Sequence, residues 1–247
     1  KANTSVMVDG EMLPGRWGRW RGRGGGMAPE KRREGASSPA KRLEDMDAEG
    51  IDVAVLFPSQ LLALPQVLDP ALALTMTQAQ HAWLVDYCAA APSRLKGIAS
   101  LALQDVPGAV KELERCVIKL GFVGAYIPPN LQGRNLDDPM FEPVWQACSA
   151  LDVPVMVHPG PGLNAAGTDR MDNFFYVHSV QFPFENMIAL MTMIGGGVFD
   201  RYPKLRACYL ESGAGWVPYW AERLNDQAAL DKYGMKLLPR ALKQKPS

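Results

Sequence analysis

The chain has 247 residues, with 26 basic and 26 acidic side chains, so its formal net charge is zero. This balance leaves no global field that attracts nucleic acid or an anionic membrane surface, and we predict neither partner. The length suits one large domain or two small ones, and an α/β barrel of roughly 250 residues fits it as one unit.

Residues 1–39 combine many arginines and glycines with almost no apolar periodicity. We predict an irregular arm or loop here and place the main domain at residues 40–247. The glycines at positions 22 and 24–26 do not make a phosphate loop, because no strand pattern precedes them and no GK[ST] sequence follows. The chain begins at Lys1 rather than methionine, which leaves room for a preceding leader or first element.

From Pro39 onward, helical and strand-like patterns alternate. The predicted helices cover residues 40–49, 69–91, 105–120, 138–151, 183–199 and 216–226. The predicted strands cover residues 51–57, 96–103, 122–127, 153–157 and 205–210. Asp69 and Asp105 are typical helix N-caps, while Gly50 and Gly121 are typical helix ends.

Connections of this length between successive strands are typical of right-handed crossovers in a parallel sheet. A dinucleotide-binding sheet is disfavoured, because no GxGxxG sequence stands at a strand-to-helix turn. A TIM-like (β/α) barrel is favoured, but five strands do not close a barrel of eight. We therefore predict either an incomplete barrel or an open sheet.

The cysteines are widely spaced, with no CxxC pair; they are Cys88, Cys116, Cys148 and Cys208. This spacing predicts reduced core thiols in a cytoplasmic protein rather than a disulfide framework. No apolar run reaches the roughly 18 residues of a membrane span, and no signal peptide pattern opens the chain.

His158 is the first candidate for chemistry. It directly follows the apolar run at 153–157 and precedes a loop that begins with Pro159 and Gly160. The carboxyl ends of parallel strands are where ligands collect, so His158 is a candidate metal ligand or acid/base. The alternative is a hydrogen-bonded structural histidine.

Glu211 occupies the equivalent place after the strand at 205–210. Its carboxylate is a candidate metal ligand or proton-transfer group, and the alternative is that Glu211 or Ser212 caps the next helix. His178 falls in the loop predicted after the fourth strand and is a candidate substrate contact, unless it only starts the next helix. His81 lies within a predicted outer helix, which favours a structural role.

Four stretches together resemble the amidohydrolase superfamily, in the branch that includes aminocarboxymuconate semialdehyde decarboxylase. They are Arg42–Ser59, Val155–Pro159, Gly195–Arg206 and Leu210–Leu224. The resemblance implies a (β/α)8 barrel with one divalent metal, commonly zinc, at the carboxyl ends of the strands. Such a metal activates water for hydrolysis or polarises the substrate for non-oxidative decarboxylation.

In the family, the ligands are a His-x-His pair on the first strand, a histidine on the fifth and an aspartate on the eighth, with a further histidine after the sixth. If the five predicted strands are the family's second to sixth, His158 matches the fifth-strand ligand. Glu211 stands where the family has its sixth-strand histidine, which is a departure from the pattern. The His-x-His pair and the aspartate have no match, so we expect a chain that lacks the first strand and the last two.

Two hypotheses follow. The first is a metal-dependent hydrolase or decarboxylase of a small, aromatic-derived organic acid, with His158 as a metal ligand, Glu211 as a ligand or acid/base, and His178 as a substrate contact. The second is a non-catalytic barrel remnant that serves as a binding or oligomerisation module. Open sheet edges, which invite pairing with another chain, motivate the second hypothesis and a homo-oligomer.

Overall fold

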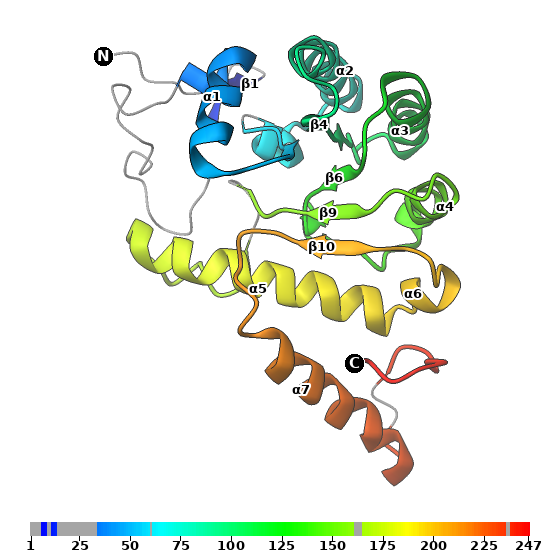
Figure 1. Cartoon of the computed structure of the whole chain (residues 1–247). Helices are drawn as coiled ribbons and strands as arrows, with labels where there is room; N and C mark the ends of the chain where they lie inside the picture. Colours follow the sequence, from blue (N-terminus) through cyan, green and yellow to red (C-terminus); the bar gives the residue numbers. More distant parts are fainter. Residues whose placement is uncertain (1–5, 9–10, 14–33, 60, 161–164, 236–237) are drawn as a thin grey trace.

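The computed structural model describes residues 6–8, 11–13, 34–59, 61–160, 165–235 and 238–247. Its centre is a series of parallel strands (Figure 1). They are β3 (Ala54–Leu56), β4 (Leu95–Gly97), β5 (Ala99–Ser100), β6 (Ala125–Ile127), β9 (Val155–Val157) and β10 (Ala207–Tyr209). All five predicted strands are confirmed, although the one at 96–103 is interrupted at Ile98 and so appears as β4 and β5.

The strands follow one another in chain order across the structure. β3 pairs with β4, and β5, β6, β9 and β10 form a four-stranded sheet in that order. Among the described residues, β3 and β10 lie at the two ends of the series and do not pair with each other. The arrangement is an open segment of a (β/α) barrel, as predicted.

Five of the helices connect successive parallel strands, whereas the first helix precedes β3 and the last follows β10 (Figure 1). The helices are α1 (Pro39–Glu49), α2 (Pro70–Cys88), α3 (Val106–Leu120), α4 (Glu142–Ala150), α5 (Phe174–Gly195), α6 (Val198–Arg201) and α7 (Val217–Ala229). Short 3-10 segments cover Glu34–Ala36 (η2), Leu61–Gln66 (η3), Pro139–Phe141 (η4) and Leu230–Tyr233 (η5). The predicted caps are present: the Asp69 carboxylate accepts from the Ala71 and Leu72 amides, and Gly121 ends α3 at φ 71°.

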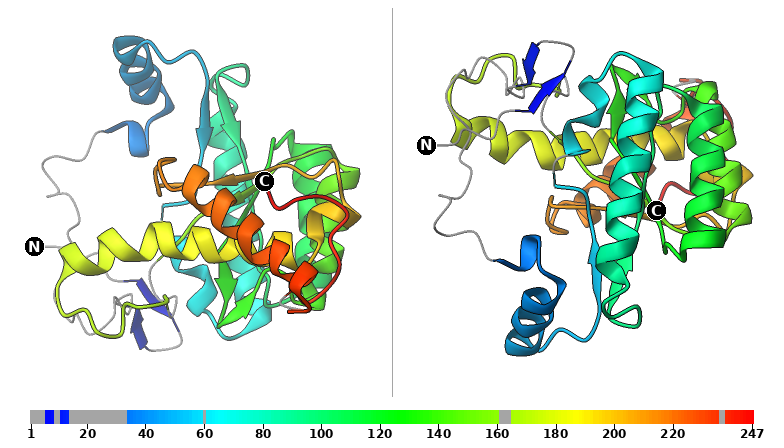
Figure 2. Two further views of the ribbon diagram at one scale, coloured as in Figure 1. Left: turned by 90° about the horizontal axis from the view of Figure 1, so that it is seen from below. Right: turned by 90° about the horizontal axis from the view of Figure 1, so that it is seen from above.

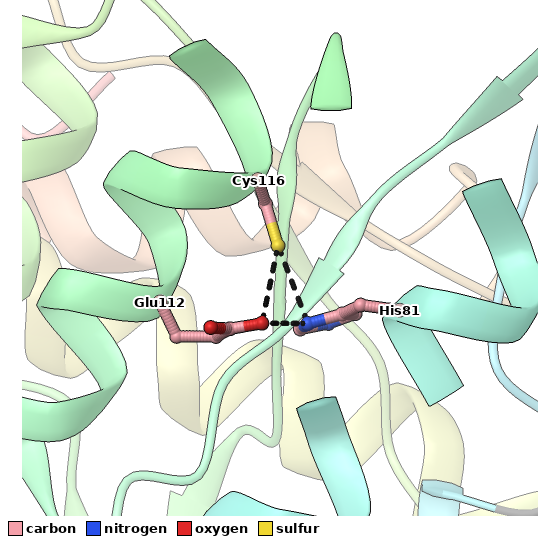
Figure 3. Close-up of side chains that lie close together, drawn as sticks. All are labelled: His81, Glu112 and Cys116. Atoms are coloured by element: carbon pink, nitrogen blue, oxygen red, sulfur yellow. Dashed lines mark hydrogen bonds and ion pairs between the residues drawn. The ribbon is translucent and has the colours of Figure 1, made fainter. Parts of the chain in front are cut away.

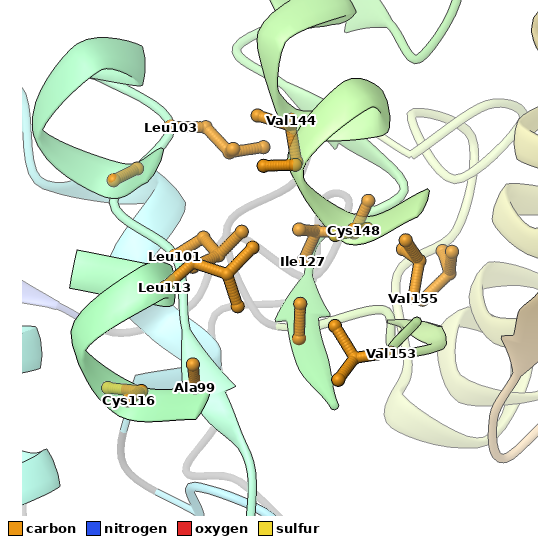
Figure 4. Close-up of a cluster of buried hydrophobic side chains, with 14 of the residues drawn as sticks. Ala99, Leu101, Leu103, Leu113, Cys116, Ile127, Val144, Cys148, Val153 and Val155 are labelled. Carbon is orange, nitrogen blue, oxygen red and sulfur yellow. The ribbon is translucent and has the colours of Figure 1, made fainter. Parts of the chain in front are cut away.

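The main core lies between the strands and helices α3 and α4 (Figure 4). Leu113 of α3, Val144 of α4 and Val155 of β9 are fully buried there. Truncating one such aliphatic side chain to alanine costs about 2–5 kcal/mol for leucine or isoleucine. This layer fixes the strands rigidly, and the strands in turn position the residues at their carboxyl ends.

Helix α5 begins earlier than predicted, so the predicted start at Pro183 is wrong. Asn173 caps the helix by accepting from the Tyr176 amide, and Pro183 lies inside it. A proline in a helix interior removes one backbone hydrogen bond, which is why the sequence favours a start at that residue. The Asn173 side-chain cap and the apolar residues before Pro183 instead stabilise a helix that starts at Phe174.

Other segments also differ from the prediction. In the predicted irregular arm, β1 (Val6–Val8) and β2 (Glu11–Leu13) form an antiparallel hairpin. The arginine- and glycine-rich part of the arm, residues 16–33, lies outside the described residues. A small unpredicted hairpin joins β7 (Asn130–Leu131) and β8 (Arg134–Asn135), and α7 continues beyond the predicted end at 226.

Cys208 corrects the prediction that all four cysteines are core thiols. Cys88, Cys116 and Cys148 are buried, but Cys208 is exposed. Side chains alternate along a strand, so Cys208 faces away from Ala207 and Tyr209. It pairs in register with Met156 on β9, and β10 is the last strand of the described sheet. In the described part of the chain, none of the helices is both long and apolar enough to cross a membrane.

Candidate functional site

His158 stands directly after β9, on the side of the sheet opposite the core. Val155 and Val157 point into the core, so alternation directs Met156 and His158 to the other face. The His158 amide donates to the Ile127 carbonyl at 3.1 Å, and Leu210 donates to the Val157 carbonyl at 3.0 Å. The strand ladder therefore continues up to His158 and holds its backbone in place.

The two nitrogens of the His158 ring have different roles. Nδ1 lies 2.6 Å from the Pro159 carbonyl oxygen, which can only accept, so Nδ1 carries the proton and donates. Nε2 is therefore the ring nitrogen that faces Glu211, 3.4 Å from its Oε1. The side chain of His158 is only 6% exposed, whereas that of Glu211 is 63% exposed. The pair thus combines a fixed, buried imidazole with an accessible carboxylate.

Three aromatic rings surround the His158 imidazole at centroid distances of 6.2–6.4 Å. Phe57 comes from the end of β3, Tyr126 from β6 and Phe182 from α5. The Tyr126 hydroxyl is buried and has no hydrogen-bond partner among the residues that the structure describes, and burial raises its pKa. Apolar walls with a few oriented polar groups are typical of small-molecule sites.

Glu211 does not cap the following helix, so that alternative is wrong. Trp216 is the N-cap of α7 and makes no side-chain capping bond. Glu211 instead adopts φ 54°, in the left-handed region that non-glycine residues rarely occupy. The backbone therefore turns at this residue, and its carboxylate is directed to His158.

Buried polar side chains of α5 hold the loops around this site. Asn186 donates to the Leu210 carbonyl at 2.8 Å and to the Ser212 hydroxyl at 3.0 Å, on either side of Glu211. Gln181 donates to the Gly160 carbonyl at 2.7 Å. A side chain at Gly160 would collide with the Leu62 carbonyl, which explains the glycine two residues after His158.

Glu185 joins two more loops to α5. Its carboxylate accepts from the Asn130 side chain at 2.7 Å and from the Ala166 amide at 2.9 Å. Burial raises the pKa of Glu185, and these two donors oppose the shift only in part. Sequence reasoning missed Gln181, Glu185 and Asn186; their signal was polar residues at helical spacing within an otherwise apolar helix.

His178 lies on α5 and not in a loop, so its predicted placement is wrong. The side chain is exposed, and its ring lies 5.0 Å from Phe174 and 4.7 Å from Phe182. Phe182 in turn packs against His158. The structure therefore brings His158 and Glu211 together and places His178 one aromatic ring away from them.

A second histidine cluster lies between α2 and α3 (Figure 3). His81, Glu112 and Cys116 are buried, and the atoms they could offer to a metal lie within 4.8 Å of one another. Nδ1 of His81 is 2.6 Å from Glu112, and Nε2 accepts from the Ser100 amide at 2.8 Å. A neutral imidazole has one lone pair, and Ser100 already uses it. Nδ1 must then carry a proton, which disfavours metal binding.

The charges of this cluster fit a structural role for His81, as predicted. Burial lowers the pKa of His81 and outweighs the opposing effect of Glu112. Burial also opposes ionisation of Glu112, but hydrogen bonds from Arg115 and His81 outweigh it and lower its pKa to about 2. A neutral histidine between a backbone donor and a carboxylate ties α2, α3 and β5 together.

The His158–Glu211 pair, in contrast, has a separation that suits two ligands of one metal ion. Two ligands bonded to one ion at about 2.0–2.1 Å in tetrahedral geometry lie roughly 3.4 Å apart. The observed separation of Nε2 and Oε1 is 3.4 Å, and Nδ1 is held by a carbonyl as in many metal-bound histidines. These two residues fit as part of a divalent metal site, which in enzymes usually has three protein ligands.

The chain matches one protein family over most of its length. Residues 13–246 match the model of the family described as "Amidohydrolase". The chain belongs to the amidohydrolase family. It is 32% identical over 190 residues to a 2-amino-3-carboxymuconate-6-semialdehyde decarboxylase from Dictyostelium discoideum, which covers 75% of this chain and 50% of that protein.

Solved structures of the family support the fold. A 2,6-dihydroxybenzoate decarboxylase in complex with 2,6-dihydroxybenzoate has a TM-score of 0.67 and 30% identity, covering 83% of this chain and 64% of the other. A 5-carboxyvanillate decarboxylase from Novosphingobium aromaticivorans, crystallised with manganese and 4-hydroxy-3-methoxy-5-nitrobenzoic acid, has a TM-score of 0.68 and 28% identity, covering 83% and 58%. This amidohydrolase-family chain thus spans between half and two thirds of these relatives.

Proposed function

We propose that this chain takes part in the metal-dependent, non-oxidative decarboxylation of a small, aromatic-derived organic acid. The observation that carries the proposal is the His158–Glu211 pair at the carboxyl end of a parallel strand, with Nδ1 of His158 held by the Pro159 carbonyl and Nε2 turned to the Glu211 carboxylate. The decarboxylases among the relatives support this reaction over hydrolysis.

His158 and Glu211 would hold the metal, with His158 as the fixed ligand. When bound, a divalent cation would supply positive charge that polarises the acid for loss of carbon dioxide. The bond between the carboxylate carbon and the organic carbon breaks, its electron pair stays on the organic carbon, and a proton replaces the carboxylate. The aromatic rings of Phe57, Tyr126 and Phe182 would exclude water from the His158 imidazole.

Glu211 has two proposed roles, metal ligand or proton-transfer group. Glu211→Gln separates them: a ligand role predicts lower metal content, whereas an acid/base role predicts normal metal content with slower turnover. His178, at the outer side of Phe182, is proposed to contact the substrate. His178→Ala should therefore raise KM more than it lowers kcat.

The metal itself is proposed only as a divalent cation, with zinc as our prediction from the sequence. Manganese in the 5-carboxyvanillate decarboxylase structure makes it the first alternative. Elemental analysis of the purified chain, followed by chelation and reconstitution with either ion, distinguishes the two. Reconstitution restores activity only with the ion that the site uses.

The central experiment measures carbon dioxide release from 2,6-dihydroxybenzoate and from 2-amino-3-carboxymuconate-6-semialdehyde. We expect release with one of these acids, its loss on chelation, and its loss in His158→Ala. Decarboxylation that is unchanged in His158→Ala would refute the proposed site. A metal-free and inactive oligomer would instead support the alternative of a binding or oligomerisation module. A separate experiment, imaging of a fluorescent fusion, tests the predicted cytoplasmic location.

A further inference from the structure

A separate cavity lies between the start of α1, the end of β3 and the middle of α2. Its volume is about 460 Å³, within the range of roughly 300–1,000 Å³ typical of small-molecule sites. Figure 2 shows the two helices that border it, α1 in blue and α2 in cyan, from below and from above. The cavity is lined by Arg42, Phe57, Gln80, Trp83 and Tyr87, among others, and neither His158 nor Glu211 lines it.

Arg42 gives this cavity its charge. Among the described residues, no hydrogen-bond partner is present for its buried Nε. Within the described part of the chain, Arg42 also has no ion pair, although nearby Lys41 and Arg94 each pair with a carboxylate. A buried donor left without an acceptor is costly, and guanidinium groups bind carboxylates through two parallel hydrogen bonds. Arg42 is therefore placed to bind an anion.

The walls of the cavity favour a flat, apolar body behind that anion. Trp83 is half exposed, and its ring lies 5.1 Å from that of Tyr87. The Tyr87 hydroxyl is already occupied, because it donates to the Gly35 carbonyl. Gln80 accepts from the Ser100 hydroxyl through Oε1, which leaves its amide nitrogen to donate. The cavity thus offers aromatic surface, one cation and one neutral donor.

We propose that this cavity is a second ligand site, distinct from the His158 site, which binds a small carboxylate with a flat apolar body through Arg42. Phe57 connects the two sites, because it lines the cavity and its ring lies 6.3 Å from that of His158. A ligand in the cavity would therefore contact a residue that also packs against His158. The binding itself does not depend on what His158 does.

Benzoate and benzamide test the proposal, since they share a ring and differ in charge. We expect calorimetric titration of the purified chain carrying His158→Ala to show that benzoate binds. Its affinity should exceed that of benzamide by at least about tenfold. Arg42→Gln in the same background should weaken benzoate binding by at least about tenfold. Lys41→Gln, which removes one positive charge at the adjacent residue, should leave it unchanged.

Several outcomes would overturn the proposal. They are equal affinity for the two compounds, equal loss in Arg42→Gln and Lys41→Gln, or no benzoate binding once His158 is replaced. If Arg42→Gln fails to fold, as judged by circular dichroism, the comparison of benzoate with benzamide in the Arg42-containing protein still decides. Failure of benzoate to bind here would leave the proposed decarboxylation at His158 unaffected.

Discussion

In the part of the chain that the structure describes, two histidine–glutamate pairs lie in opposite environments. His81 and Glu112 are both buried, and each atom that could bind a metal already has a partner. His158 is as firmly fixed, but its Nε2 faces only an exposed carboxylate. The difference shows that the distance between two side chains does not identify a reactive pair. What matters is whether the imidazole lone pair is already used.

The largest expected effect is on activity at His158 and Glu211, called the open pair here because Nε2 of His158 faces an exposed carboxylate. His158→Ala should lower decarboxylation by on the order of 10³-fold, because a ligand and its bound charge are lost. The melting temperature should fall as well, because the buried imidazole loses one hydrogen bond and its packing against three aromatic rings. Steady-state rates and thermal melts measure both, with Glu114→Ala, at an exposed position on α3, as the control. Activity that falls only in proportion to the loss of folded protein at the assay temperature would show that His158 is structural.

At His81 and Glu112, the closed pair whose side chains are both buried, the expected effect is on stability and not on activity. Glu112→Ala removes one partner of a buried network and should destabilise the fold by about 3–5 kcal/mol. At about 2–4 °C per kcal/mol, the melting temperature would fall by roughly 6–20 °C. Glu114→Ala, at an exposed position on the same helix, is the control. Equal melting temperatures for these two variants would contradict the structural role.

Acid should weaken the closed pair before it unfolds the protein completely. The Glu112 pKa is about 2 in the folded chain against an ordinary value of 4.5. The unfolded chain therefore takes up the proton first, so the stabilisation is complete above pH 4.5 and is lost as the pH falls toward 2. Urea melts over this pH range should show that the free energy of unfolding depends less steeply on pH in Glu112→Gln than in the unmodified protein. An unchanged slope would mean that Glu112 does not titrate in this way.

A smaller effect is expected when the support of the open pair is removed. Asn186→Ala deletes both hydrogen bonds that flank Glu211 and should reduce metal affinity or activity by about 10–100-fold. In a Glu211→Gln background the same change should have little further effect, because the supported group is absent. Asn186→Ser, which keeps one donor, should recover part of the loss. Additive effects would assign Asn186 to general stability.

The smallest expected effect is a difference in thiol reactivity between the cysteines that lie near the two pairs. Cys116 lies 3.2 Å from Nδ1 of His81 and is buried, whereas Cys208 is exposed on the strand that leads to Glu211. Burial raises the pKa of Cys116 and of Cys148, the latter to about 12, which slows their reaction further. A thiol reagent should modify about one cysteine in the native protein, and Cys208→Ser should remove that fast reaction. Fast labelling of Cys116 would show that the closed pair opens to solvent.

The sequence by itself determined the alternation of helices and strands and the position of His158 after a buried strand. These features follow from local information: apolar periodicity, the carboxylate caps at Asp69 and Asp105, and the glycine ends at Gly50 and Gly121. His81 was also recognisable as structural from its place within a helix. The start of α5 was not, because Pro183 suggests a boundary that the Asn173 cap overrides.

Only the tertiary structure decided which atoms of the site are available. The state of each imidazole depends on partners distant in the sequence, such as Ser100 for His81 and Glu211 for His158. The same is true of Asn186, which reaches the loop around Glu211 from another element. Such contacts arise from packing and not from local pattern, so a sequence can mark a residue as polar and well placed while its partners, and therefore its chemistry, are set by the fold.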